Sequence, residues 1–319
     1  MVKILESKGL TYNNIVVIPK LGIMNTRDNV DVSQEFLGKH YKLPIIPANM
    51  KCVIDFKLAE WLANNGYFYI LHRFYSYDDV FNWIKDNQNL PLISISVGVK
   101  QRDKDFIDKI FHAGLRVDVV TIDISHGYST LMKEMITVVK SQLNCKVIAG
   151  NIWGDKDSVE ALQSWGADAL KVGLSYGKAC ITYNKTRIAS PMFSCGLEAS
   201  KWAKIPLIGD GSIRENGDIS LGLIAGYSMI MAGSIFSACK DSPAEYDETR
   251  NIKFYYGSAS FHNKGYNKNI EGRLVEMPCN NMTFAEKLEE IRQDLTSTCS
   301  FLGGNNLQCL DYAECQIVE

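Results

Sequence analysis

Val119-Val120-Thr121-Ile122-Asp123, Val147-Ile148-Ala149 and Ala169-Leu170-Lys171-Val172 are three short apolar runs. Each is rich in β-branched or aliphatic residues, which predicts a strand. The segments between them, Leu131–Val139 and Ser158–Trp165, carry apolar residues at helical spacing. Because apolar strands alternate with helices, we expect a parallel sheet that is buried on both faces.

The same alternation extends in both directions along the chain. It gives eight predicted strands: Leu43–Ile46, Phe68–Leu71, Leu92–Val97, Val119–Asp123, Val147–Ala149, Ala169–Val172, Leu207–Ile208 and Met229–Ala232. Five further helices are predicted: Phe56–Ala63, Tyr77–Lys85, Asp103–Phe111, Phe193–Ala203 and Asn216–Leu223. Eight such units favour a closed (β/α)₈ TIM barrel, as one catalytic domain over residues 1–319. The alternative is an open doubly wound sheet, which is disfavoured because no G-x-G-x-x-G follows the first strand.

Composition excludes several classes of protein. The formal net charge is −2 and no run of Lys or Arg reaches five residues, so we expect no nucleic-acid partner. No apolar run has the length of a membrane span, and the first residues do not resemble a signal peptide. Nine cysteines without a CxxC pair are typical of reduced thiols. We therefore expect a cytoplasmic protein without a membrane partner.

The residues after the predicted strands are polar or glycine-rich. In a barrel, these C-terminal strand ends form the active site. Gly211 and the pair Gly233-Ser234 follow the seventh and eighth strands, where backbone N–H groups often bind phosphate, although each glycine could equally serve a turn. Asp210 could accept the hydroxyl groups of a ribose or cap a helix.

Cys180 lies in a glycine-flanked loop after the sixth strand, two residues before Thr182. Backbone N–H groups and a nearby lysine favour the thiolate form of such a cysteine, which is the nucleophilic form. Phosphate, ribose and a reactive cysteine together suggest a nucleotide whose base is attacked.

Eleven segments in order along the chain resemble the IMP dehydrogenase/GMP reductase family. They are Pro47–Met50, Leu71–Phe74, Ser94–Gly98, Asp123–Ser129, Ile148–Asn151, Lys171–Gly173, Cys180–Thr182, Gly217–Ile219, Met231–Ser234, Tyr256–Ser260 and Asn269–Gly272. The resemblance implies a (β/α)₈ barrel, usually assembled as a homotetramer, with an N-terminal extension and a C-terminal segment that packs at the active-site face. It also implies a cysteine that attacks C2 of a purine nucleotide to form a thioimidate.

Within this family the chain is more similar to the reductases than to the dehydrogenases. The dehydrogenases carry a regulatory insertion after the second strand, but here one helix separates His72 from Leu92. They also carry a long flap with an Arg-Tyr pair that activates water, for which Ser260–Glu271 is too short. The resemblance therefore implies reductive deamination, in which GMP loses ammonia, NADPH delivers hydride and IMP is released.

Matching residues carry the implied roles. Cys180 matches the nucleophile, and Thr182 and Glu271 match the pair that relays a proton to the leaving amine. The residues that match substrate contacts are Met50, Lys178, Asp210, Gly211, Ser212, Gly233, Ser234, Ser258, Ala259, Ser260, Lys268 and Gly272.

The dinucleotide contacts divide into two groups. Asp123 and Ser125 match contacts near the nicotinamide ribose, and Arg73 matches a basic contact. Guanidinium groups suit the 2′-phosphate of NADPH, because they bind phosphate bidentately. The other matching residues, some of them given by a neighbouring subunit, are Thr26, Arg27, Val172, Gly173, Ser297, Thr298, Cys299 and Ser300. A monovalent cation such as K⁺ is implied at Ser175, Gly177 and Cys180.

Three loops depart from the family pattern. The cysteine loop, normally G-x-G-P-G, reads Gly173–Gly177 with Ser175 and Tyr176 in place of glycine and proline, which predicts a reshaped loop. Arg187 replaces a glycine beside the site, and Ser212 replaces the second glycine after Asp210. Reduction of another purine nucleotide, or binding of GMP or IMP without turnover, therefore remain alternatives.

Overall fold

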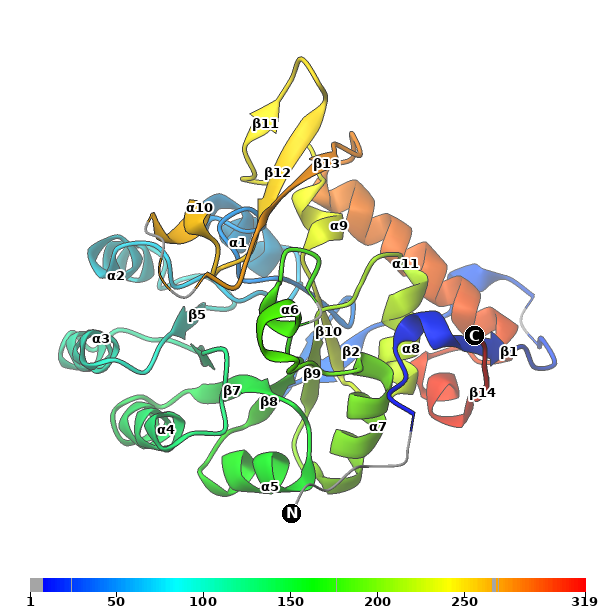
Figure 1. Ribbon diagram of the computed structural model, residues 1–319, viewed down its shortest axis with the longest axis horizontal. Helices are drawn as coiled ribbons and strands as arrows, with labels where there is room; N and C mark the ends of the chain where they lie inside the picture. Colours follow the sequence, from blue (N-terminus) through cyan, green and yellow to red (C-terminus); the bar gives the residue numbers. More distant parts are fainter. Residues whose placement is uncertain (1–7, 24, 176, 266–267, 269) are drawn as a thin grey trace.

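The computed structural model describes residues 8–23, 25–175, 177–265, 268 and 270–319. Its centre is a curled sheet of seven parallel strands (Figure 1). In spatial order the strands are β4 (Ile45–Pro47), β10 (Met229–Ala232), β9 (Leu207–Asp210), β8 (Ala169–Val172), β7 (Lys146–Ile152), β6 (Val119–Asp123) and β5 (Ser94–Val97). This sheet confirms the α/β class and the parallel arrangement.

Helices surround the curled sheet (Figure 1). They are α1 (Phe56–Asn64), α2 (Tyr77–Asp86), α3 (Gln101–His112), α4 (Thr130–Gln142), α5 (Lys156–Ser164), α6 (Thr182–Thr186), α7 (Met192–Trp202), α8 (Gly217–Ile224), α9 (Ser234–Ser237), α10 (Phe261–Lys264) and α11 (Phe284–Phe301). Capping side chains fix where several helices begin. At the start of α1, for example, Leu58 N donates to Asp55 Oδ1 at 2.8 Å. The buried face of α2 repeats at helical spacing through Val80, Trp83 and Ile84.

In the part of the chain that the structure describes, the hydrogen-bonded strands do not close into the expected eight-stranded barrel. Phe68–Leu71 is fully buried, as expected, but it joins the sheet only through one parallel bridge between Leu71 and Ile95. The carbonyl of Leu71 accepts the hydroxyl of Ser96 at 2.6 Å, and the hydroxyl of Tyr69 donates to the carbonyl of Leu92 at 2.8 Å. These side-chain contacts supplement the backbone hydrogen bond from Leu71 N to the Ser94 carbonyl at 3.0 Å, and the hydrogen-bonded sheet stops at seven strands.

Three small antiparallel sheets flank the central one. They are formed by β1 (Ile15–Ile18) with β14 (Glu314–Ile317), by β2 (Gln34–Phe36) with β3 (Lys39–Tyr41), and by β11 (Tyr246–Asp247), β12 (Ile252–Tyr256) and β13 (Leu274–Pro278). Short 3₁₀ turns lie at η1 (Tyr12–Asn14), η2 (Arg27–Asn29) and η3 (Leu307–Tyr312). The pairing of β1 with β14 ties the two ends of the described chain together, and α11 packs along α8. The assignment of residues 1–319 to one catalytic domain stays a prediction.

None of the helices in the described residues is both long enough and apolar enough to cross a bilayer.

Candidate active site

Cys180, Thr182 and Glu271 form a continuous hydrogen-bonded chain. The Cys180 thiol donates to Thr182 Oγ1 at 3.3 Å, and the Thr182 hydroxyl donates to Glu271 Oε2 at 2.9 Å. All three residues are half-buried, and Thr182 is the first residue of α6. A proton can therefore pass between the sulfur and the carboxylate through one hydroxyl group.

Backbone pairing brings Glu271 to Thr182, beside the cysteine, across 89 positions of sequence. Ile181 N donates to the Glu271 carbonyl at 2.9 Å, and Arg273 N donates to the Ala179 carbonyl at 2.9 Å. Gly272 lies between these contacts, where a Cβ atom would come within 2.8 Å of Ser260 N. The residue is glycine because the strand-like segments approach too closely for a side chain.

A buried ammonium group lies between two carboxylates at the end of the sheet. Lys171, whose side chain is 3% exposed, places Nζ 2.9 Å from Asp123 Oδ1 and 2.7 Å from Asp210 Oδ2. Burial alone would raise the pKa of Asp123, but the charges of Lys171 and Arg73 outweigh burial and hold it below its ordinary value. The two carboxylates in turn raise the pKa of Lys171 against the opposing effect of burial. In this trio of Lys171, Asp123 and Asp210, the shifted pKa values keep Asp123 and Lys171 ionised at neutral pH.

Two asparagines fix the carboxylates of this trio. Asn151 Nδ2 donates to Asp210 Oδ2 and to the Gly173 carbonyl, both at 2.7 Å, and Asn49 Nδ2 donates to Asp123 Oδ2 at 3.2 Å. Lys171 and Asn151 thus both contact Oδ2 of Asp210. Asp210 keeps a side-chain exposure of 22%, so its carboxylate can still meet a ligand.

The two expected phosphate loops lie at neighbouring strand ends. Asp210 ends β9, and Gly233 directly follows β10, which pairs with β9 in parallel. Ser234 begins α9 and is buried. A Cβ on Gly233 would come within 2.5 Å of the Tyr255 hydroxyl, which donates to Met50 Sδ at 3.5 Å. The structure thus adds Tyr255 to the wall of this region.

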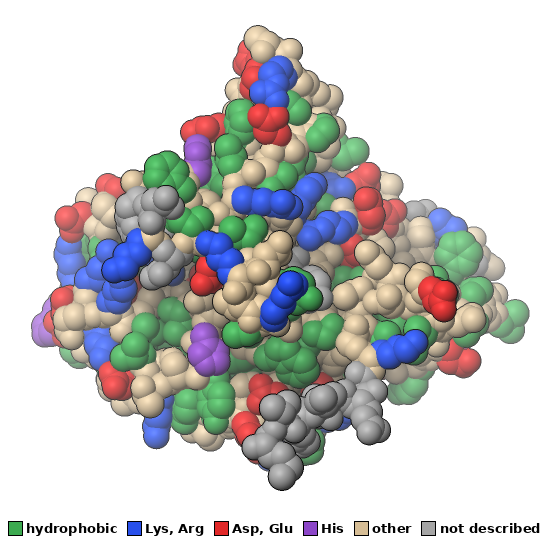
Figure 2. All heavy atoms as spheres, viewed as in Figure 1, with side chains coloured by type: hydrophobic (Ala, Val, Ile, Leu, Met, Phe, Trp, Pro, Cys, Tyr) green, Lys and Arg blue, Asp and Glu red, His purple; other side chains and the backbone are tan. Residues whose placement is uncertain are grey.

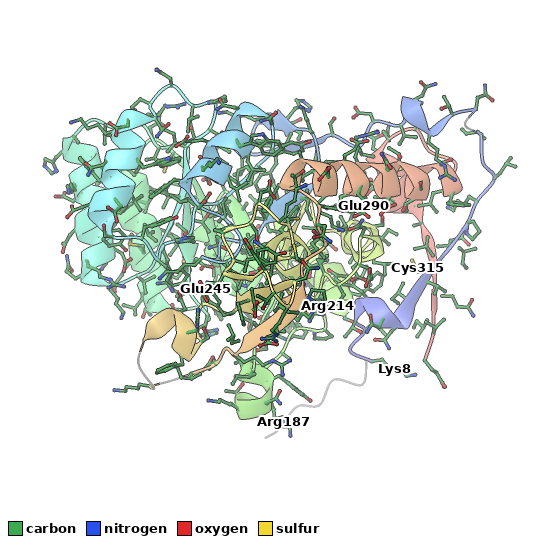
Figure 3. The ribbon with its side chains drawn as sticks, turned by 90° about the horizontal axis from the view of Figure 1, so that it is seen from above. Lys8, Arg187, Arg214, Glu245, Glu290 and Cys315 are labelled. Carbon is green, nitrogen blue, oxygen red and sulfur yellow. The ribbon has the colours of Figure 1, made fainter. Side chains whose placement is uncertain are left out.

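The serines that replace glycines keep a glycine-like backbone. Ser175 has φ 72° and Ser212 has φ 67°, both in the left-handed region that glycine adopts most easily. At these two positions the loops have not moved to a conformation that serine prefers. Tyr176 lies outside the described residues. Arg187, with φ 61°, ends α6 and places its guanidinium 5.1 Å from the centre of the Tyr183 ring, at the outer end of this helix (Figure 3).

The other predicted substrate residues lie on the segments beside the cysteine loop. Ser260 N donates to the Gly257 carbonyl at 2.9 Å, and Glu271 N donates to the Ala259 carbonyl at 3.1 Å. The Ser258 carbonyl accepts Asn263 Nδ2 at 2.8 Å. Lys178 is half-buried and Lys268 is exposed, whereas Asn269 lies outside the described residues. Figure 2 shows several Lys and Arg side chains on the face that carries α6, β12 and β13, which suits an anionic ligand.

The predicted cofactor residues fall into two separate groups. Arg73, Asp123 and Ser125 lie near the sheet, with the Arg73 guanidinium 5.1 Å from the centre of the Phe74 ring. Arg27 Nη1 donates to Ser297 Oγ at 2.9 Å near the C-terminal end of α11, which Figure 1 places at the edge of the molecule and apart from α6.

The remaining predicted cofactor residues differ in exposure. Thr26 is exposed, and Ser300 is half-buried. Thr298 Oγ1 accepts the Ser220 hydroxyl at 3.1 Å. Cys299 and Val172 are fully buried, so their side chains do not reach a ligand at the surface. Gly173, with φ 141°, leaves no room for a Cβ atom, which would lie 2.1 Å from the Asp210 carbonyl oxygen.

Sequence reasoning assigned no individual role to Lys171, Asn49, Asn151 or Tyr255, although the first three lie in the segments that resemble the family. One signal was present, because a lysine inside the apolar run Ala169–Val172 requires a buried counter-charge. Its partners could not be read from the sequence, since they lie 48 and 39 residues away on other strands.

Comparison with known proteins gives a consistent result. Residues 9–289 match the model of the IMP dehydrogenase / GMP reductase domain. The chain is 45% identical over 314 residues to a GMP reductase of Oenococcus oeni, covering 97% of this chain and 96% of the relative. It is 42% identical over 313 residues to a GMP reductase of Staphylococcus carnosus, covering 96% and 95%. A GMP reductase of Acidovorax ebreus is 41% identical over 304 residues, covering 93% and 92%. The chain belongs to the IMP dehydrogenase/GMP reductase family.

Proposed function

We propose that this protein is an oxidoreductase, an NADPH-dependent GMP reductase that converts GMP to IMP and ammonia through a thioimidate on Cys180. The observation that carries the proposal is the chain from the Cys180 thiol through Thr182 to Glu271, with its 3.3 Å and 2.9 Å contacts. The relatives that match this chain over nearly their whole length are named GMP reductase, which supports the same substrate.

In the first step the Cys180 thiol loses its proton to Glu271 through the Thr182 hydroxyl. The sulfur then forms a bond to C2 of the purine, and the electron pair of the ring C=N bond moves onto nitrogen. The geometry supports this role because a nucleophile needs a base within hydrogen-bonding reach, here through one intervening hydroxyl.

In the second step the proton returns from Glu271 through Thr182 to the exocyclic amino group. The C2–N bond breaks as the ring C=N bond re-forms, and ammonia leaves. Protonation is required because an unprotonated amine is a poor leaving group. The balance is one thiol proton added to the leaving NH₂ group.

The substrate is expected to lie across the ends of β8, β9 and β10. Asp210 would accept ribose hydroxyls with its carboxylate, which Lys171 and Asn151 orient at 2.7 Å each. The backbone after Gly211 and Gly233 would donate to the phosphate.

The residues near Asp123 fit a dinucleotide. Arg73 Nε is buried and has no hydrogen-bond partner among the described residues, so its guanidinium is available to donate to an anionic ligand. NADPH, when bound, supplies the hydride that takes the place of sulfur at C2. Asp123 and Ser125 would hold its ribose, and Arg27 with Ser297 would serve a second cofactor region, donated by a neighbouring subunit of a homotetramer.

A monovalent cation at Ser175, Gly177 and Cys180 remains part of the proposal, and no step above depends on it. The Gly177 carbonyl accepts Cys180 N at 2.9 Å, which fixes the turn that presents the thiol. A cytoplasmic location is likewise proposed.

The test is Cys180→Ala, assayed with GMP and NADPH. We expect GMP binding to stay and NADPH oxidation to fall to background, because no neighbouring side chain replaces the thiolate. Intact-mass measurement of wild type quenched during turnover should show a nucleotide adduct on the peptide with Cys180. Residual turnover in the variant would refute the covalent step. If wild type turned over another purine nucleotide but not GMP, the proposed substrate would be refuted. If wild type bound GMP without turning it over, the proposed catalysis would be refuted.

A further inference from the structure

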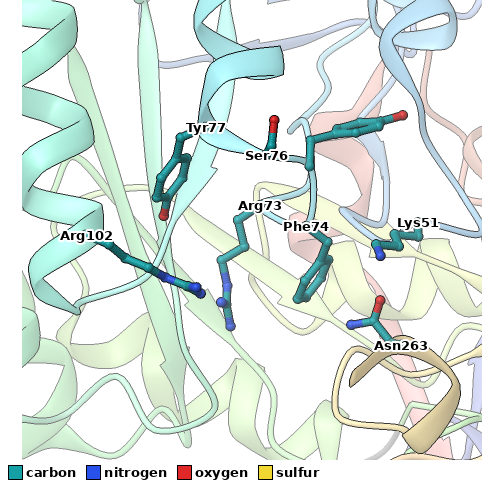
Figure 4. A pocket seen from close by; sticks show the side chains of 8 residues that line it. Lys51, Arg73, Phe74, Ser76, Tyr77, Arg102 and Asn263 are labelled. Atoms are coloured by element: carbon teal, nitrogen blue, oxygen red, sulfur yellow. The ribbon is translucent and has the colours of Figure 1, made fainter. Parts of the chain in front are cut away.

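An opening of about 260 Å³ lies beside the end of the sheet, between the residues after Leu71, the start of α3 and the start of α10 (Figure 4). Its lining includes Lys51, Arg73, Arg102, Phe74 and Asn263. Figure 4 shows the ends of the two arginine side chains directed into the same space, with Lys51 and Asn263 across from them. Three cations from separate segments thus converge on one opening.

These three cationic side chains form no ion pair within the part of the chain that the structure describes. None of the described carboxylates forms an ion pair with Lys51, Arg73 or Arg102, and the buried Arg73 Nε has no described hydrogen-bond partner. Asp103, the carboxylate that follows Arg102 in the chain, is buried and already accepts Gly98 N at 2.8 Å, Lys100 N at 2.7 Å and the Tyr77 hydroxyl. A cluster of three cations that form no ion pair among the described residues is suited to an anionic ligand.

The opening adjoins the expected hydride-transfer site. Arg73 lies close enough to Asp123 for its charge to lower the pKa of that carboxylate. Asn263 connects the opening to the substrate side, because its Nδ2 donates to the Ser258 carbonyl at 2.8 Å while its Oδ1 is buried without a partner among the described residues. An anion in this opening would therefore be close to a ribose held by Asp123.

We propose that this opening binds the pyrophosphate of the dinucleotide, with Arg102 and Lys51 acting together with Arg73. The inference rests on the proposed function, in which Asp123 holds the nicotinamide ribose. Pyrophosphate is the group joined directly to that ribose, whereas the 2′-phosphate is carried by the distant adenosine ribose. Planar guanidinium groups bind such oxygens bidentately, and the Lys51 ammonium adds a point charge.

If the opening binds the pyrophosphate, its residues determine how tightly either cofactor binds but not which of the two cofactors is preferred. NADPH and NADH share the pyrophosphate and differ only in the 2′-phosphate. Arg102 should therefore strengthen binding of both cofactors equally, and Arg73 should act at the pyrophosphate instead of the 2′-phosphate. The preference for one cofactor must then come from another region, such as the one around Arg27.

The test uses Arg102→Gln, because Arg102 is exposed and its replacement leaves the core intact. The matched control is Lys133→Gln, which removes one exposed positive charge on α4. NADPH and NADH binding are titrated by the fluorescence of the reduced nicotinamide, and the KM values for GMP and both cofactors are measured. We expect Arg102→Gln to weaken both cofactors by the same factor, roughly tenfold to a hundredfold, as for a lost charge-assisted contact. The GMP KM and the control variant should not change.

Inorganic pyrophosphate provides a second readout, since it should compete with NADPH on wild type and lose affinity in Arg102→Gln. Unchanged cofactor binding in Arg102→Gln would overturn the inference, as would a loss confined to NADPH, which would assign Arg102 to the 2′-phosphate. Pyrophosphate that binds without displacing NADPH would also overturn it, by identifying a separate effector site. Failure of wild type to turn over GMP would refute the proposed function alone, because the titrations measure cofactor binding without turnover.

Discussion

Replacing Lys171 with Met should destabilise the folded protein and change how its stability depends on pH. Lys171 is the counter-charge for both Asp123 and Asp210, at 2.9 Å and 2.7 Å. The substitution preserves much of the side-chain volume but leaves two carboxylates facing each other without an ammonium group. Removing one partner of a buried ion pair costs about 3–5 kcal/mol.

The size of the loss follows from the exposure of the carboxylates. Asp123 and Asp210 keep 17% and 22% side-chain exposure, so water partly solvates them after the ammonium is lost. We therefore expect the lower end of that range, about 3 kcal/mol of unfolding free energy at pH 7. For a chain of 319 residues, this corresponds to a fall in Tm of about 4–5 °C.

The pH dependence should differ in sign between the two proteins. In wild type the pKa of Asp123 is held below its ordinary value, so the stability it contributes is present above about pH 4 and is lost as the pH falls further. In Lys171→Met the ammonium is lost and the Arg73 charge is the remaining cationic influence on Asp123, so we expect burial to dominate and to raise the pKa of Asp123. The folded variant then binds a proton more readily than the unfolded chain, so its deficit should shrink between pH 7 and pH 5.

Urea unfolding at pH 7 and pH 5, at one protein concentration, measures both effects. Lys133→Met controls for the loss of a lysine and should stay within about 0.5 kcal/mol of wild type. Adding Asp123→Asn to Lys171→Met removes one uncompensated charge and should recover part of the loss. A loss of unfolding free energy below about 1 kcal/mol, or an equal loss at both pH values, would show that Lys171 is not the counter-charge that stabilises Asp123 and Asp210.

Three further substitutions have defined outcomes. Glu271→Gln should lower kcat by about 10²–10⁴ with little change in GMP binding, and Thr182→Val should lower it less; wild-type turnover in Glu271→Gln would remove Glu271 from the relay. Ser212→Gly should raise unfolding free energy by about 1 kcal/mol, because glycine adopts φ 67° without strain, and an unchanged urea midpoint would contradict this. Arg27→Gln should reduce the preference for NADPH over NADH by roughly tenfold, measured as the ratio of their kcat/KM values, and equal use of both cofactors by wild type would contradict the assignment.

Local periodicity determined most of the secondary structure. Val119–Asp123, Ala169–Val172 and Met229–Ala232 were predicted with the observed boundaries, because each is a continuous apolar run whose residues must leave water. Phe68–Leu71 follows the same rule, and its burial was predicted correctly. Its pairing was not, because apolar character determines burial while hydrogen-bond register depends on neighbouring strands and on side chains such as Tyr69.

The site divides in the same way. Cys180 and Thr182 could be linked from the sequence because a single residue separates them. Asp210 could be placed because it closely follows a predicted strand. Glu271 could be named only through the family resemblance, since no local pattern connects residues 89 positions apart. The sequence by itself determined which segments are buried and which polar groups follow the strands. Only the tertiary structure decided which of those groups meet. Lys171, Asp123 and Asp210 lie on different strands, and the order of the strands in the sheet brings them together. The ammonium group is buried between the two carboxylates only once those strands lie in the same sheet.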